Sequence, residues 1–205
     1  MRRKSKYQLI RKSNNFVNSY SHRGPDVSMK DHNLVVKLAK KCLREICKKQ
    51  HEIYFGSNPI NYGDAVRHML IYTENNSRRS WGSYGAIKIN VGHYFGGFGR
   101  GVRGFTEYKA FADDPVIGSY RCNDWELLIF GIVAHEVSHH IQDYCGKWTR
   151  HLKHSYKKPH GHAFQNIYRT LRRTLVNPLV EESNDRNLQE ARTQADLLKA
   201  VREAA

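Results

Sequence analysis

The sequence predicts an α+β fold in which a small, mostly antiparallel sheet packs against several helices. Residues 127–134 form an apolar run, as expected of a helix that is buried on all sides. Residues 28–50 carry apolar side chains at helical spacing, and residues 86–91 alternate apolar and polar side chains as a half-buried strand does. A chain of 205 residues suits one such domain with extensions.

Composition predicts three parts: a basic, flexible N-terminal arm at 1–27, a folded domain at 28–178 and a C-terminal helical extension at 179–205. No apolar run reaches the length of about 18 residues that a membrane helix needs, so we expect no membrane span. No apolar signal core follows the basic N-terminus. We therefore expect a cytoplasmic protein with reduced cysteines.

The formal net charge of +15 predicts a polyanionic partner, with nucleic acid ahead of acidic protein surfaces. In the arm, no acid precedes Asp26, and the cations are Arg2, Arg3, Lys4, Lys6, Arg11, Lys12 and Arg23. Such a segment suits phosphate contacts without base recognition. A solvated tail on a generally basic protein is the alternative.

The first helix is expected to begin at a cap, Ser28 or Asp31, and to run to about Gln50. Its buried stripe should comprise Val35, Ala39, Cys42, Leu43 and Ile46. The outer face is basic and is either solvated or a nucleic-acid surface; it carries Lys37, Lys40, Lys41, Arg44, Lys48 and Lys49.

Strands are predicted at 67–73, 86–91 and 107–111. In the second, Ile87, Ile89 and Val91 should point inward, and Lys88 and Asn90 outward. The glycine-rich segment 96–104 contains a Gly-x-Gly-x-x-Gly pattern, but no strand and helix flank it as a dinucleotide site requires. It is a candidate flap, an Arg-Gly nucleic-acid contact or a plain connection.

The apolar helix is expected to begin at Asn123 or Asp124, to end at Gly146 and to carry His-Glu-x-x-His. Residues four apart share one helix face, so His135 and His139 can bind one metal ion. Glu136 is rotated by about 100° from His135 and can take a proton from bound water. Gly131, one turn earlier, would allow close backbone approach.

Catalytic zinc usually has three protein ligands and a water. The extended pattern His-Glu-x-x-His-x-x-Gly-x-x-His fails, because Gln142 replaces its glycine and Cys145 its third histidine. The third ligand must therefore come from further along the chain, where His160 and His162 open the next predicted helix at 162–176. That helix should end at Asn177-Pro178, and a last helix is expected at 185–203 to pack on the domain or on a partner.

The two motifs, His135-Glu136-x-x-His139 and His160-Gly161-x-x-Phe164, resemble those of the SprT/Spartan family of zinc metallopeptidases. The resemblance covers roughly residues 65–175. It implies a zincin-like domain at 28–178, zinc (Zn²⁺) as the cofactor, His160 as the third ligand and Phe164 packed beneath the site. It also implies a protein substrate and cleavage of proteins bound or crosslinked to DNA. The zinc ribbon that some members carry is not found in this sequence.

We expect Glu136 to act as general base and the hairpin that contains 86–91 to form the wall of the substrate cleft. Candidates for stabilising the oxyanion are Tyr144, Tyr156 and Arg150, and Asp143 is a candidate for orienting an imidazole. DNA, single- or double-stranded, would contact the arm and the basic loop 147–158.

Three other functions are compatible with the sequence. The chain can be the same peptidase with an ordinary protein target. It can be a basic nucleic-acid-binding protein with a structural metal site, although Glu136 then has no purpose and a closed site lacks its fourth ligand. It can also be a zinc hydrolase that uses a late glutamate ligand, Glu181 or Glu182.

Overall fold

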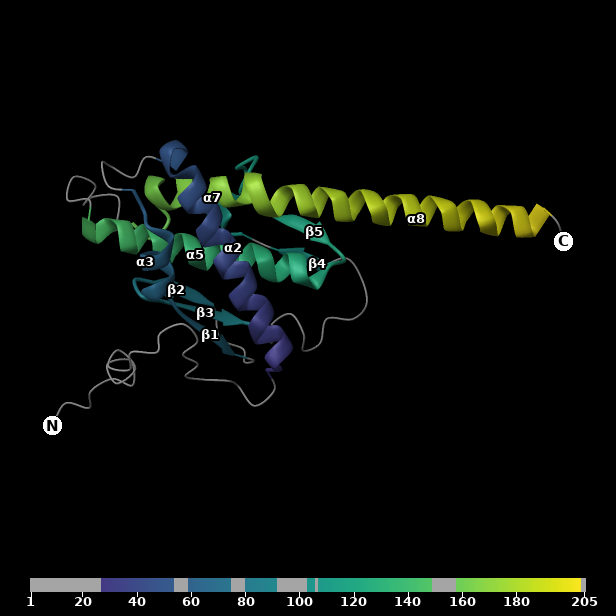
Figure 1. The fold of residues 1–205 in the computed structure, drawn as a ribbon. Coiled ribbons are helices and arrows are strands. Elements are labelled where there is room, and N and C mark those ends of the chain that lie inside the picture. The colour runs from purple at the N-terminus through teal and green to yellow at the C-terminus, as the bar shows by residue number, and fades with distance from the viewer. Residues whose placement is uncertain are drawn as a thin grey trace.

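The computed structural model describes residues 27–53, 59–74, 80–91, 103–105, 107–148 and 158–203. Helices and two small sheets make a mixed α+β arrangement (Figure 1). Most of the predicted arm, the glycine-rich segment up to residue 102 and residues 149–157 of the basic loop lie outside these ranges. Within them, no helix combines the length and the apolar character that crossing a bilayer requires.

The larger sheet has three strands in the order β1 (Leu70–Glu74), β3 (Ala86–Asn90), β2 (Trp81–Ser83). β1 runs parallel to β3, and β2 runs antiparallel to it. A second, antiparallel pair joins β4 (Arg103–Phe105) to β5 (Tyr120–Cys122). The prediction of a mostly antiparallel sheet is thus wrong for the longest pairing, because β3 pairs with its hairpin partner β2 on one side and takes β1, which runs in its own direction, on the other.

Two of the three predicted strands differ from the observed elements. The chain at 67–69 is not yet a strand, because residues 62–67 form helix α3 (Tyr62–Arg67), whose cap Asn61 accepts the N–H of Asp64 at 3.2 Å. Residues 109–111 form a short 3-10 helix (Lys109–Phe111) instead of a strand. In β3 the predicted inner residues are buried, but Asn90 is buried too, because this central strand is covered on both faces.

Helix α2 (Met29–Ile53) matches its predicted pattern. Ser28 caps it by accepting the N–H of Asp31 at 3.1 Å. The predicted apolar stripe is fully buried along its whole length, which confirms the helical spacing as a core signal. His32 links the helix to β1 through a 2.8 Å hydrogen bond between its Nδ1 and the hydroxyl of Thr73.

Helix α5 (Trp125–Trp148) lies at the centre of the fold and contacts α2, α7 and both sheets. Asp124 caps it by accepting the N–H of Glu126 at 2.8 Å. The helix continues through Gly146, which therefore does not end it. Gly131 makes room for the phenol of Tyr120, whose hydroxyl donates to the carbonyl of Leu127 at 2.7 Å, so a side chain, not backbone, approaches there.

One helical stretch runs from α7 (His162–Leu171) through a π-helical turn (Arg172–Val176) into α8 (Asn177–Glu203). The predicted helix end at Asn177-Pro178 is wrong. The wider π turn just before Pro178 accommodates a residue that has no N–H and whose ring crowds the carbonyl one turn earlier. The predicted domain boundary at 178/179 thus falls inside α8.

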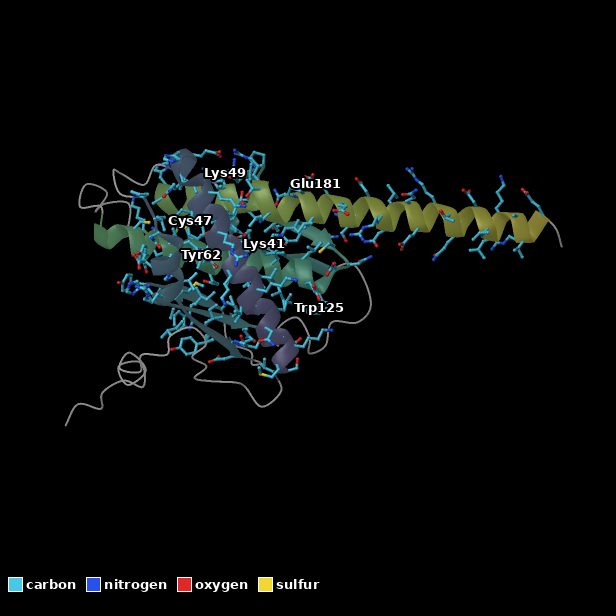
Figure 2. All side chains as sticks on the ribbon, viewed as in Figure 1. Lys41, Cys47, Lys49, Tyr62, Trp125 and Glu181 are labelled. Carbon is cyan, nitrogen blue, oxygen red and sulfur yellow. The ribbon has the colours of Figure 1, made fainter. Side chains whose placement is uncertain are left out.

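The far part of α8 extends away from the rest of the molecule (Figure 1). Val180 and Ser183 are its buried residues, and Asn184 donates to the carbonyl of Arg121 in β5 at 3.0 Å. Beyond that point side chains leave the helix into solvent (Figure 2), including the exposed apolar residues Leu188, Leu197, Leu198 and Val201. The predicted last helix therefore does not pack on the domain.

Candidate metal centre

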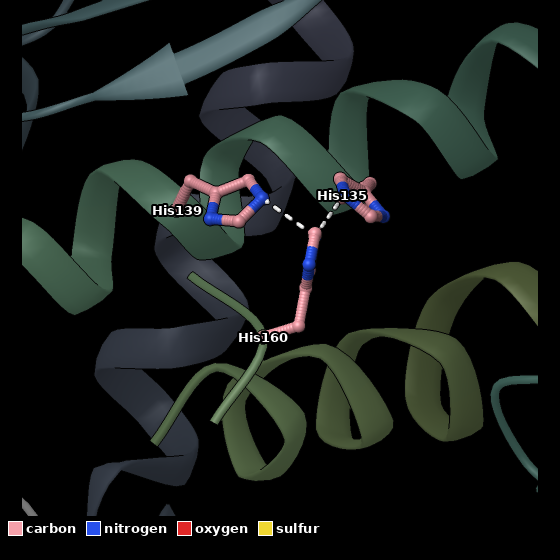
Figure 3. Close-up of side chains that lie close together, drawn as sticks. All are labelled: His135, His139 and His160. Atoms are coloured by element: carbon pink, nitrogen blue, oxygen red, sulfur yellow. Dashed lines mark hydrogen bonds between the residues drawn. The ribbon is translucent and has the colours of Figure 1, made fainter. Parts of the chain in front are cut away.

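Three imidazoles converge between α5 and α7 (Figure 3). His135 and His139 lie one turn apart on α5, and His160 comes from the turn just before α7. The Nε2 atom of His160 lies 3.2 Å from Nε2 of His139 and 3.3 Å from Nε2 of His135. Residues far apart in sequence thus bring three potential ligand nitrogens to one point.

The three histidine nitrogens lie within 4.8 Å of one another and could hold a metal ion. Two nitrogens bound to one tetrahedral zinc at about 2.0–2.1 Å lie about 3.3 Å apart, close to both distances here. Among the described residues, the group that could hold a metal comprises only the three histidines. Three protein ligands with one open position are typical of catalytic zinc, whereas structural sites are closed by a fourth.

Comparisons with protein-family models, curated proteins and solved structures found no match to this chain.

Two glutamines hold the turn that carries His160. The turn is closed by a 2.9 Å hydrogen bond from Gly161 N–H to the carbonyl of Lys158. Gln142, from α5, donates to that same carbonyl at 3.1 Å, and Gln165, from α7, donates to the carbonyl of His160 at 3.0 Å. Gln142 also shares a hydrogen bond with His139. Gln142, which replaces the glycine of the extended zinc motif, therefore contacts both His139 and the turn that carries His160.

His162, the other predicted third ligand, is the first residue of α7 and is exposed. It does not belong to the histidine group. Phe164, two residues further on, is fully buried and touches all three rings, with centroid distances of 4.9 Å to His135, 4.4 Å to His139 and 4.9 Å to His160. It forms the floor on which the three imidazoles lie, as the family resemblance implied.

Tyr108 lies beside the same group and is partly exposed. Its ring centroid is 4.3 Å from that of His160 and 5.6 Å from that of His135, and 47 % of the residue is exposed. Nothing in the sequence singles it out, because it stands alone in a loop without a motif. The tyrosine that was predicted as an oxyanion donor, Tyr144, stacks on Tyr84, on the side of α5 where the β2–β3 turn is held.

Glu107 is a second residue at this site that no sequence pattern indicated. Its side chain is 1 % exposed, and its Oε2 lies 3.4 Å from Nδ1 of His135, the nitrogen that faces away from the other two histidines. Tyr168 donates its hydroxyl hydrogen to Oε1 of Glu107. Asp143, the predicted orienting acid, accepts the N–H of Tyr84 at 3.1 Å and so anchors the β2–β3 turn.

Burial favours the neutral form of two of the imidazoles, those of His139 and His160. Removal from water, together with the neighbouring His135 and His160, lowers the pKa of His139 to about 3. Burial and His135 likewise lower the pKa of His160. A neutral imidazole offers a lone pair to a metal ion, whereas an imidazolium does not. His139 and His160 can therefore offer their lone pairs to a cation at neutral pH without first losing a proton.

Glu136 is buried beside His135, and removal from water raises its pKa to about 7, with the charge of Glu107 adding to the rise. A carboxyl group with that pKa can exchange protons near neutral pH.

The remaining candidate residues do not join the site. Tyr156 and Arg150 lie outside the described residues, and Glu181 and Glu182 are exposed on α8.

Proposed function

We propose that the chain is a zinc-dependent endopeptidase of the SprT-like type. The observation that carries the proposal is the convergence of three histidine nitrogens within 4.8 Å of one another, with Nε2 of His160 at 3.2 Å and 3.3 Å from the other two Nε2 atoms, close to the spacing that a tetrahedral zinc requires. Bound zinc would supply Lewis-acid polarisation of a peptide carbonyl and a water of lowered pKa. His135, His139 and His160 would hold it.

Glu136 is proposed as the general base and acid. It is buried next to a ligand, and its raised pKa lets it accept a proton from the attacking water and return that proton to the leaving amine nitrogen. Tyr108 is proposed to donate a hydrogen bond from its hydroxyl to the developing oxyanion, because it borders His160 and is exposed. Replacing Tyr108 with Phe should lower kcat about 100-fold or more and leave zinc binding unchanged.

The edge of the sheet suits an extended substrate. β2 is an edge of the described sheet, and it lies against α5 at Glu136 and His139. A peptide that adds to β2 by backbone hydrogen bonds would pass next to the three histidines. This arrangement keeps the predicted role of the β2–β3 hairpin as the wall of the cleft.

The direct test compares the wild type with Glu136→Gln on an unfolded protein substrate such as casein. The variant should keep its zinc, measured by metal analysis, and lose cleavage. Glu126→Gln is the matched control, since Glu126 is an exposed glutamate of the same helix. Equal cleavage by Glu136→Gln and the wild type would overturn the role of Glu136. Absence of cleavage by both would overturn the proposal that the chain is a peptidase.

DNA is proposed as the partner that brings protein substrates to the site. The net charge is +15, and α2 exposes cations on successive turns of one face, namely Lys37, Lys41, Arg44 and Lys48. Cleavage should rise when single- or double-stranded DNA is added, and DNA binding should weaken steeply with salt. Changing Lys37 and Lys48 to Gln should reduce the salt slope by about one for each lysine that no longer meets a phosphate.

The basic charge also favours one other function, that of a nucleic-acid-binding protein in which the metal site is structural. In that case Glu136→Gln would leave DNA affinity unchanged, and the wild type would show no cleavage with DNA present. A peptidase with an ordinary protein target would instead cleave without DNA stimulation and show no salt-dependent DNA binding.

A further inference from the structure

A buried carboxylate, a phenol and a guanidinium lie in series behind His135. Glu107 approaches Nδ1 of His135 at 3.4 Å, Tyr168 donates to Glu107, and Arg172 lies 3.7 Å from the same carboxylate oxygen. The Tyr168 residue is fully buried, and the side chains of Glu107 and Arg172 are 1 % and 2 % exposed. This row of polar side chains is separate from the three ligands and from Glu136.

The contact at Nδ1 decides which nitrogen His135 offers to a metal. His135 turns Nε2 toward His160, so its Nδ1 faces Glu107. A carboxylate at Nδ1 holds the ring proton there, which leaves the lone pair on Nε2. It also restricts rotation of the ring, so the ligand is held in its binding orientation before the ion arrives.

Glu107 is itself held from three sides. Tyr168 donates to its Oε1, and Arg172 places a positive charge 3.7 Å from that oxygen. Its backbone N–H donates to the hydroxyl of Ser119 at 3.2 Å. A carboxylate with these partners cannot swing away from His135 without leaving buried groups unpaired, which is costly.

Arg172 anchors the series to the rest of the fold. It donates to the carbonyls of Ile117 at 2.6 Å and Gly118 at 3.2 Å and to Oδ1 of Asn177 at 2.8 Å, and its guanidinium lies 4.7 Å from the ring centre of Tyr120. Arg172 is the first residue of the π-helical turn. Such turns are rare and frequently occur at functional sites.

Stability alone is a weak reason for this arrangement. A buried ion pair is often no better for stability than apolar side chains of the same size. Here the buried charges end at an imidazole that belongs to the candidate metal centre. We propose that Glu107, Tyr168 and Arg172 are positioning residues that fix the ring of His135 and thereby set the affinity of the site for zinc. The inference rests on the metal-binding part of the proposed function and not on peptide hydrolysis.

The test measures zinc affinity by competition with a chromophoric chelator, using the full chain. Glu107→Gln should weaken zinc binding about 10- to 100-fold, the usual effect of losing a carboxylate behind a histidine ligand. Tyr168→Phe keeps the ring on which His135 packs, removes the hydroxyl, and should weaken binding about 3- to 10-fold. Tyr144→Phe is the matched control, because it removes a hydroxyl on α5 that does not contact Glu107, Tyr168 or Arg172. The zinc affinity of this variant should match that of the wild type.

The double variant separates positioning from general damage. If Tyr168 acts through Glu107, adding Tyr168→Phe to Glu107→Gln should change the zinc Kd by less than about twofold. Additive losses, or wild-type affinity in both single variants, would overturn the inference. If Glu107→Gln does not fold, the comparison of Tyr168→Phe with Tyr144→Phe decides. Failure of the wild type to bind zinc would overturn the proposed function as well, so the two failures are distinguishable.

Discussion

Gly82 of β2 packs directly against the backbone carbonyl of Glu136 in α5. A Cβ atom at position 82 would collide with that carbonyl and would lie 3.0 Å from Cβ of His139. The turn after β2 is tied to the same helix, because Tyr84 donates its N–H to Asp143 at 3.1 Å. The edge strand and the turn of α5 that carries Glu136 and His139 are therefore held as one unit.

Gly82→Ala should push β2 away from α5. Since the obstacle is backbone on a buried helix, we expect a loss of about 1–3 kcal/mol in the free energy of unfolding, measured with denaturant. Cleavage should fall with it. Gly104→Ala is the control, since its Cβ would meet no atom closer than 3.9 Å. An unchanged midpoint for Gly82→Ala would contradict the packing described here.

Arg172→Met should destabilise the fold strongly. It leaves the buried carboxylate of Glu107 without its positive partner and frees the carbonyls of Ile117 and Gly118. Breaking a buried pair in this way typically costs about 3–5 kcal/mol. Arg173→Met changes the exposed neighbour and should cost less than about 0.5 kcal/mol. Comparable losses for the two variants would show that the buried contacts of Arg172 are not responsible.

Asp114 should make the stability of the fold depend on pH. Burial alone would raise its pKa, but the N–H groups of Ile117 and Val116 and the paired guanidinium of Arg169 outweigh it, so the pKa is lowered from 3.8. A folded pKa below the unfolded value stabilises the fold above the unfolded pKa, and this contribution is lost as the pH falls through the folded pKa.

The measurement for Asp114 is denaturant unfolding of Asp114→Asn at several pH values. The variant should be less stable than the wild type at neutral pH, and the difference should shrink below about pH 3–4. Asp113→Asn, at the exposed neighbour, should show a small difference at every pH. A difference for Asp114→Asn that stays constant down to low pH would mean that its charge does not contribute.

Removing residues 188–205 should change stability little. The described side chains in this stretch are exposed, and the last buried residue of α8 is Ser183. We expect a change in the free energy of unfolding of less than about 0.5 kcal/mol. Val180→Ala, which trims a buried residue of the same helix, should cost more. A large loss on truncation would show that this part of α8 packs against the domain.

The parts of the site that were predictable carry local signals. The spacing of His135 and His139 follows from helix geometry, and the apolar run before them indicates burial. The family resemblance then directed attention to His160 and Phe164, which the structure places against the first two histidines. The buried face of α2 was equally predictable, since apolar residues on one face of a helix recur every three to four positions.

The parts that were missed depend on contacts between distant segments. Glu107 stands 28 residues before His135, in a stretch predicted only as a strand and not as part of the site. Its role arises only when α7 brings Tyr168 and Arg172 beside it. The parallel pairing of β1 with β3 is likewise a tertiary feature that alternation within one strand does not specify. The helix through Pro178 needed a π turn, which has no established sequence signature here.

The central claim is that His135, His139 and His160 bind one zinc ion and leave one position open. Zinc-edge X-ray absorption of the wild-type protein, loaded with one equivalent of zinc, tests it most directly. The expected spectrum shows about three imidazole nitrogens at about 2.0–2.1 Å and one oxygen from water. Sulfur neighbours at about 2.3 Å, or a spectrum of free aqueous zinc, would contradict it.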